Sequence, residues 1–297
     1  MKMLMNIGFD NSARLCRDIY YFEYKGIRFK LIQKNMRKWC DALLTIIERD
    51  EKVKSKIYLI ASEFLAALSW QNDSRVKLRP LGGISLPDNF HLRKAKSGFS
   101  GFPGIPYHIF KKGFDICIIP EIETEEQKTA LILFREALSS NNIYLSFLFY
   151  WQILETGGND PIEWVNKVVR KKKNYNRLLV SKDEIHHLPL NGKSLGNYFY
   201  DDCRNAIAHI KRDPGKVKLK LDSLEDIKRI SYSTGILMKF ARFYIEDKLM
   251  LQKELYLVRK KGSGFPVFVN EKIYKDNGYG LAYKRLSLDE VRKKRWH

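Results

Sequence analysis

The sequence is poor in cysteine and has no apolar run long enough to cross a bilayer. Its 297 residues include only four cysteines, Cys16, Cys40, Cys117 and Cys203, and no C-x-x-C pair. This scatter excludes a disulfide-stapled scaffold or a cysteine-based zinc framework and is typical of buried thiols in a reducing compartment. The most apolar stretch, residues 143–154, is far shorter than the ~20 residues of a membrane-spanning helix. No secretory signal opens the chain, so we expect a cytoplasmic protein without a membrane partner.

Acidic side chains are also scarce relative to basic ones. The chain has 54 Lys and Arg against 34 Asp and Glu, a formal net charge of +20. A charge of this size points to a polyanionic partner, and nucleic acid is favoured over an anionic membrane. The alternative is that the charge serves solubility alone. The length allows two domains, or one domain with extensions.

Apolar periodicity separates an N-terminal part, residues 1–122, from the rest. Residues 19–32 alternate between apolar and polar side chains and predict a β-hairpin. Helical spacing over 36–47 and again over 57–70 predicts two helices, and short strand-like pieces such as 76–78 follow. We therefore expect a small α+β domain over residues 1–122.

Helical patterns dominate the region that follows, residues 123–252. It begins with a capping box, Thr124 to Gln127, and its stretch 143–154 is apolar on every side, as in the centre of a helical bundle. The sequence predicts an antiparallel bundle of four or five helices here. Residues 253–297 are strand-like and then basic, and predict a small C-terminal β extension. The expected fold class is therefore mainly α.

One stretch of this region, residues 195–214, combines a core face with chemically active side chains. Its spacing predicts one amphipathic helix that ends at Pro214 and displays Arg204, Asn205 and His209. On an ideal helix Arg204 lies ~140° around the axis from His209, whereas Asp202, Asn205 and His209 lie near one edge of the apolar stripe. The apolar positions are Leu195, Phe199, Cys203, Ala206, Ile207 and Ile210.

The residues Arg204-Asn205-Ala206-Ile207-Ala208-His209 resemble the signature of the HEPN superfamily (higher eukaryotes and prokaryotes nucleotide-binding), R-x(4–6)-H with a polar residue after the arginine. The resemblance covers about residues 124–250. It is greatest to longer bacterial members with an N-terminal extension, some of which take their name from neighbouring methylamine-utilisation operons. The resemblance implies a helical bundle and, as in many members, metal-independent endoribonuclease activity in toxin–antitoxin or phage-defence systems. Some HEPN toxins carry a tyrosine two residues after the histidine, where this chain has Lys211.

The residue types suit metal-independent RNA cleavage. A histidine with a pKa near 6.5 takes and returns a proton around neutral pH, and a fixed guanidinium binds phosphate oxygens through two hydrogen bonds. We therefore predict His209 as general base or acid, Arg204 as phosphate clamp and Asn205 as the residue that orients one of them. The resemblance implies that two copies of the chain share one cleft. Arg292 and His297 repeat the spacing without an apolar frame, so the spacing alone carries little information.

Basic residues on both sides of this helix are predicted to hold the RNA backbone by counterion release, with a merely solvated surface as the alternative. The adjacent His186 and His187 have no cysteine or carboxylate cluster near them in sequence, so we expect no metal and no cofactor. The predicted RNA-binding residues are Lys171, Lys172, Lys173, Arg177, Lys211 and Arg212.

The expected partners are RNA and a second copy of the chain, and the toxin context adds an antitoxin or regulatory protein. Two other hypotheses stay open. The chain is either a non-catalytic module that binds nucleic acid or nucleotide, or a helical scaffold whose basic surface has no ligand. Salt-dependent RNA binding without a product would favour the first, and no retention of nucleic acid at moderate salt would favour the second.

Overall fold

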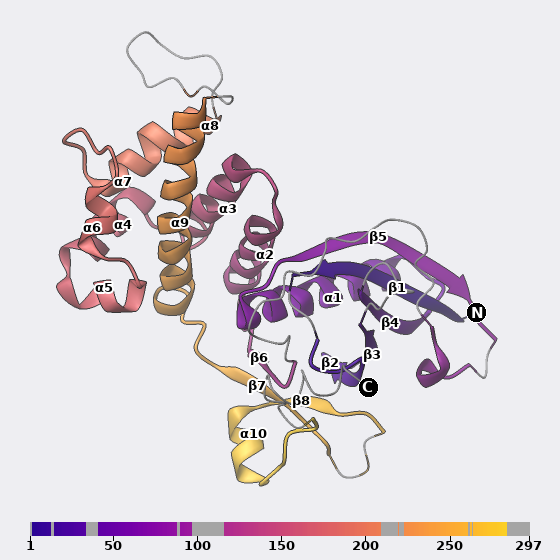
Figure 1. Ribbon diagram of the computed structural model, residues 1–297. Helices are drawn as coiled ribbons and strands as arrows, with labels where there is room; N and C mark the ends of the chain where they lie inside the picture. The colour runs from indigo at the N-terminus through magenta and orange to yellow at the C-terminus, as the bar shows by residue number, and fades with distance from the viewer. Residues whose placement is uncertain are drawn as a thin grey trace, which may run out of the picture. The chain divides into compact units, whose positions relative to one another are not determined.

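The chain folds into two units. The first joins residues 1–122 to residues 252–297, and the second spans residues 123–251 (Figure 1). Among the described helices, none combines the length and the apolar content that crossing a bilayer requires. The computed structural model describes residues 2–12, 15–33, 41–87, 90–96, 116–208, 219, 223–260, 262 and 264–283.

A single sheet organises the described part of the first unit. Its strands follow the order β5-β1-β4-β3-β2-β8-β7-β6. Neighbouring strands are antiparallel, except that β2 and β8 are parallel. The strands are β1 (Lys2–Asn11), β2 (Ile19–Tyr24), β3 (Ile27–Ile32), β4 (Asp41–Glu48), β5 (Val76–Ser85), β6 (Ile118–Pro120), β7 (Glu254–Val258) and β8 (Val267–Asn270).

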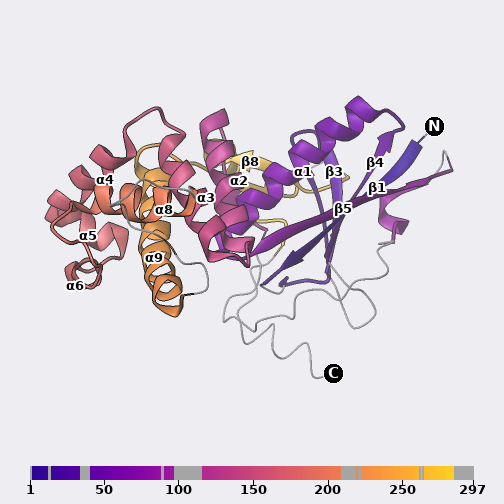
Figure 2. The ribbon, with the colours of Figure 1, turned by 90° about the horizontal axis from the view of Figure 1, so that it is seen from above.

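The two faces of this sheet are covered differently. Helix α1 (Glu51–Asn72) lies across one face (Figure 2), where the ring of Phe64 stacks on that of Phe22 with centroids 4.5 Å apart. The other face carries a smaller apolar cluster, which includes Leu92 of the short 3-10 helix η1 (Leu92–Lys94) and Leu44 of β4. This second face is therefore only partly covered by the described residues, and it carries the pocket treated below.

The predicted fold class, mainly α, is wrong. Most of the first unit is sheet, and its strands come from both ends of the chain. The segment 253–297, expected as a separate small extension, supplies β7 and β8, and β8 pairs with β2 of the N-terminal hairpin. Helix α10 (Glu271–Asp276) follows β8 directly. The sequence pattern missed this because sheet pairing across more than 200 residues leaves no local periodicity.

Helices make up the described part of the second unit. The Thr124 capping box is present, with the Thr124 hydroxyl accepting from the backbone N–H of Gln127. Helix α9 packs along α3, and the two lie side by side in Figures 1 and 2. The helices are α2 (Glu125–Ser139), α3 (Ile143–Glu155), α4 (Pro161–Arg170), α5 (Lys172–Leu178), α6 (Lys182–His186), α7 (Leu195–Asn197), the π-helix η2 (Tyr198–Arg204), α8 (Asn205–Ala208) and α9 (Leu224–Asp247).

Candidate nucleic-acid site

The stretch predicted as one α-helix is a composite of α7, η2 and α8 as far as Ala208, the last described residue before the gap. Its wide π-turn is visible in the backbone bonding, because the N–H of Asn205 donates to the carbonyl oxygen of Tyr200, five residues back. The predicted core face is confirmed at Leu195, Phe199, Cys203 and Ala206, which are buried, whereas Ile207 is only half-buried. π-Turns inside helices occur frequently at functional sites.

Arg204 lies at the end of this π-helix and is half-buried. Its Nη1 donates to Oδ1 of Asn205 at 3.1 Å, and its guanidinium lies 5.7 Å from the ring centroid of Tyr200. The Tyr200 ring in turn packs against Trp151 of α3, with centroids 5.9 Å apart. Among the residues that the structure describes, no carboxylate pairs with Arg204. The guanidinium is thus oriented by an amide and a ring, while its charge has no acidic partner within that set.

His209 lies outside the described residues, as do Lys211, Arg212 and Ile210. The ~140° separation between Arg204 and His209, which follows from ideal helix geometry, therefore stays a prediction.

Asp202 has a structural role rather than a place beside Arg204 on an open edge. Its side chain is 7% exposed, and Oδ1 accepts from Nζ of Lys193 at 2.6 Å. The Asp202 hydrogen bond is the main contribution that raises the pKa of Lys193. The sequence-based expectation that Asp202 shares an edge with Asn205 assumed an α-helical turn, and the π-turn between them changes that geometry.

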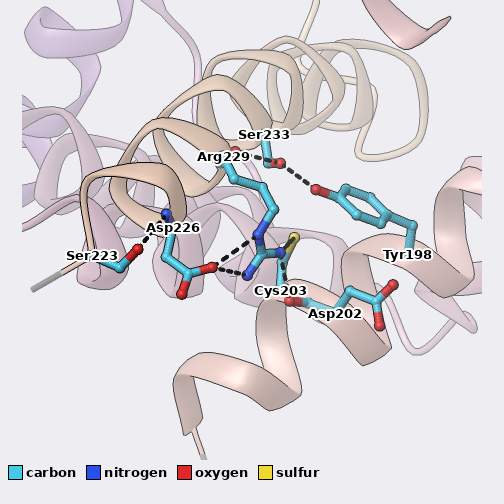
Figure 3. A network of polar contacts seen from close by, with 7 residues as sticks. All are labelled: Tyr198, Asp202, Cys203, Ser223, Asp226, Arg229 and Ser233. Carbon is cyan, nitrogen blue, oxygen red and sulfur yellow. Dashed lines mark hydrogen bonds and ion pairs between the residues drawn. The ribbon is translucent and has the colours of Figure 1, made fainter. Parts of the chain in front are cut away.

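A second set of polar contacts fastens the π-helix to α9 (Figure 3). Nη1 of Arg229, from α9, donates to the carbonyl oxygen of Asp202 at 2.9 Å and lies 3.9 Å from Sγ of Cys203. The other side of the same guanidinium pairs with Oδ1 of Asp226 through Nε at 3.3 Å and Nη2 at 3.0 Å. Arg229 therefore joins the first turn of α9 to the segment that ends in Arg204.

Burial perturbs two groups in this network. It raises the pKa of the Cys203 thiol to about 11 and that of the Tyr198 hydroxyl to about 12. The Tyr198 hydroxyl lies 3.1 Å from Oγ of Ser233, and this Oγ donates to the carbonyl oxygen of Arg229 at 2.9 Å. Both groups stay neutral near pH 7, so they pack and hydrogen-bond as structural members of the helix contact.

Arg177, predicted to bind RNA, makes contacts within the second unit. Its Nη1 donates to Oδ1 of Asp247 at 2.8 Å, and its guanidinium lies 4.6 Å from the ring centroid of Phe243. These partners lie near the end of α9, whereas Arg229 lies near its start. Eighteen residues of α-helix separate Arg229 from Asp247, roughly 27 Å at 1.5 Å per residue. The structure therefore does not bring Arg177 to the Arg204 end of α9.

The predicted lysine run lies where α4 ends and α5 begins. Lys171 and Lys173 are exposed, and they lie near two further exposed cations, Lys167 and Arg170. Lys172 is the first residue of α5. Figure 1 places α5 beside the last turns of α9 and α8 beside its first turns. The basic run and Arg204 are thus two separate positively charged features of the second unit.

The two adjacent histidines belong to the end of α6. Nδ1 of His187 lies 2.5 Å from the carbonyl oxygen of Asp183, one turn earlier, while His186 is exposed. Within the described ranges, no three His, Cys, Asp or Glu residues come together in a group that would hold a metal ion.

Sequence reasoning missed the residues that position Arg204. The sequence patterns singled out neither the aromatic residues Tyr200 and Trp151 nor the cations Lys193 and Arg229. For Arg229 a local signal existed, because Asp226 precedes it by three residues, a spacing typical of helical ion pairs. No local signal indicated its second contact, to a carbonyl group 27 residues earlier.

Comparison with known proteins gives one match. The family model described as "Methylamine utilization protein MauJ" matches residues 130–246, within the second unit. No curated protein and no solved structure is significantly similar to the chain. The match agrees with the likeness to bacterial proteins named after methylamine utilisation. It covers the helices that carry Arg204 and Arg229.

Proposed function

We propose that the second unit is a HEPN-type domain and that the chain is a metal-independent endoribonuclease with a role in toxin or phage-defence systems. One observation supports this above all. Arg204 of the R-x4-H signature is half-buried, oriented by Asn205 and Tyr200, and has no acidic partner among the described residues. Arg177, by contrast, pairs with a carboxylate, that of Asp247. An oriented guanidinium without one suits phosphate binding.

The proposed reaction needs few groups. The 2′-hydroxyl of the RNA attacks the adjacent phosphorus, His209 or its symmetry mate takes the hydroxyl proton, and a proton is returned to the departing 5′-oxygen. The products are a 2′,3′-cyclic phosphate and a 5′-hydroxyl. The Arg204 guanidinium binds the non-bridging oxygens, where negative charge builds up in the transition state.

A homodimer is part of the proposal. One imidazole cannot both accept and donate in a single concerted step, and Arg204 and His209 point to different sides of an ideal helix. Two-fold pairing of the signature helix supplies a second copy of each side chain to one cleft. An antitoxin or regulatory protein would then act by covering this cleft.

A second candidate function is RNA binding without cleavage. It is favoured by the four exposed cations over 167–173, which lie apart from Arg204 and suit a backbone-binding surface. In this case RNA binding would weaken steeply with salt and no product would form.

The test is cleavage of a mixed RNA substrate by the purified full-length chain in excess EDTA, with the 3′ ends analysed for cyclic phosphate. We expect cleavage by the wild type and a loss of at least a hundredfold in His209→Ala, a size typical of general acid–base catalysis. Arg204→Lys keeps the charge but loses the planar fork, so it should retain only part of the activity. Circular dichroism checks that each variant is folded.

The tail supplies the matched control. His297→Ala makes the same change five residues after an arginine, outside the predicted bundle, and should cleave as the wild type does. Cleavage that persists in His209→Ala, or that stops on chelation, would contradict the proposed mechanism. RNA binding without cleavage in the wild type would favour the second candidate.

A further inference from the structure

The first unit contains a pocket on the sheet face opposite α1. Its volume is about 540 Å³, within the range of small-molecule sites. The walls come from strands β1 to β4, from the segment around η1 and from the residues that precede β8. The lining residues with the chemistry used below are Lys2, Glu23, Arg28, Phe90, Arg93 and Phe265.

Cations and rings alternate in a row that starts at the pocket wall and continues beyond it. The guanidinium groups of Arg28 and Arg93 each lie 5.6 Å from the ring centroid of Phe265. The Arg93 guanidinium also lies 5.8 Å from the ring centroid of Tyr21. Lys30 follows, 5.5 Å from the Tyr21 ring. Cation–π contacts hold guanidinium groups in fixed planes without neutralising their charge. The stack therefore keeps two arginine planes in place at the pocket.

The hydrogen bonds of the two lining arginines leave donors available. Arg93 uses Nη2 for the carbonyl oxygen of Gly264, at 2.9 Å. Arg28 uses Nε for Oε2 of Glu23, at 3.3 Å, and its side chain is 63% exposed. Lys2 adds a third, exposed cation at the edge. Each guanidinium has five donors, so both retain N–H groups that a phosphate can accept from.

We propose that this pocket binds a nucleoside phosphate. Arg28, Arg93 and Lys2 supply the positive charge and the forked donors for the phosphate oxygens. Phe90 supplies the ring against which a planar base stacks, while Phe265 holds the two arginines. Glu23 supplies an acceptor for the amino group of a base or the hydroxyl groups of a ribose. A nucleoside phosphate combines the anion, the planar ring and the hydrogen-bond donors that these residues would bind.

The pocket favours a free nucleotide over an RNA strand. Its volume corresponds to one small ligand, whereas a strand requires a groove that continues past several nucleotides. All of its residues belong to the first unit. The inference therefore does not rest on the endoribonuclease proposed for the second unit, and either can fail without the other.

Isothermal titration calorimetry of the full-length chain with ADP tests the proposal, with pyrophosphate and adenosine as separate titrants. We expect ADP to bind more tightly than either part. Arg28→Ala should weaken ADP binding roughly tenfold to a hundredfold, the range for loss of a charge-assisted hydrogen bond. Phe90→Leu should weaken ADP binding but leave pyrophosphate binding within about twofold, because it removes the stacking ring, keeps every charge and leaves the Phe265 ring that holds the two arginines. Glu23→Gln should tighten pyrophosphate, since it removes the carboxylate beside Arg28.

The matched control is Arg75→Ala. Arg75 is an exposed arginine of the same unit that directly precedes β5, at the end of β1 remote from Lys2. Equal losses in Arg28→Ala and Arg75→Ala would show a diffuse charge effect and overturn the proposal. ADP that binds no better than pyrophosphate would also overturn it. So would Arg28-dependent binding of an eight-nucleotide single-stranded RNA by a protein that does not bind ADP, because that result would assign the surface to a strand.

Discussion

Replacing Arg229 by methionine tests whether α9 holds the π-helix in place. The substitution keeps an aliphatic stem of similar reach but removes every donor. The carbonyl oxygen of Asp202 then loses its 2.9 Å hydrogen bond, and Oδ1 of Asp226 loses the two hydrogen bonds that it accepts from Nε and Nη2. Both acceptors remain in a contact region where the side chains of Arg229 and Asp226 are only 16% and 19% exposed.

The expected cost is about 2 kcal/mol. Hydrogen bonds to charged groups contribute roughly 1.5–3 kcal/mol, and the residual solvent access of the pair keeps the total toward the lower part of that range. The second unit spans residues 123–251. For a domain of this size 1 kcal/mol shifts the melting temperature by roughly 3–5 °C, so the unit should melt about 6–10 °C lower.

Calorimetry of the full-length chain measures the shift, and hydrogen exchange of the amides over 203–208 measures the local effect. Lys228→Met is the matched control, because Lys228 is the exposed neighbour on the same helix and loses the same charge. Arg229→Met should lower the melting temperature and speed exchange over 203–208, and Lys228→Met should do neither. Equal behaviour of the two variants would show that Arg229 does not anchor the π-helix.

Two further predictions concern stability. Gly196→Ala should destabilise the protein by about 1–3 kcal/mol, because the new Cβ would press against the backbone of Ile162. Gly235 lies on the exposed side of α9 with open space around its Cα, so Gly235→Ala should stabilise the protein by up to about 1 kcal/mol. Urea unfolding measures both changes, and a change of the same sign in the two variants would refute the packing argument. Burial raises the pKa of Cys203 from 9.0 to about 11. The contribution of the neutral Cys203 thiol to the free energy of unfolding is therefore complete below pH 9 and declines as the pH rises toward 11. Cys203→Ala should therefore lose less stability than the wild type as the pH rises from 9 to 11. In the wild type at pH 8, the half-exposed Cys16 should react with iodoacetamide well before the buried Cys203.

Some elements of the fold were predictable from the sequence. The hairpin over 19–32 is confirmed as β2 and β3, and the helix expected over 57–70 forms the greater part of α1. Both have local patterns that a short window detects, namely strict alternation and helical spacing over several turns. A helix or strand is therefore predicted correctly where its periodicity is clear and the element that it pairs with is close in sequence.

The helix predicted over 36–47 is wrong for its described part, which is strand β4. Leu43 and Ile47 are four residues apart, a spacing that puts both on one face of a helix and also on one face of a strand. β4 lies between β1 and β3 and is buried on both faces, so its sequence shows no alternation. A short apolar run of this kind does not distinguish the two structures. Pairing with β1 and with β3 decides for the strand.

The candidate site illustrates a similar ambiguity. Leu195, Phe199 and Cys203 recur every four residues, a spacing that fits an α-helix and also the wider turn of a π-helix. The sequence therefore identified the buried face correctly but assumed the wrong turn around Tyr198 to Arg204. The Arg229 contact that accompanies the π-turn comes from a helix far along the chain, and no window of local sequence contains both partners.

The net charge of +20 indicated a polyanionic partner but not where it binds. That depends on which cations have acidic neighbours in the fold. Arg177 looked as suitable for RNA as Arg204 in the sequence, yet Asp247 pairs with it from 70 residues away. Arg204 has no such carboxylate among the described residues, and Arg28 has one carboxylate neighbour, the half-buried Glu23. Because a guanidinium has five donors, the N–H groups that Arg204 and Arg28 do not use within the fold make these two positions specific tests of anion binding.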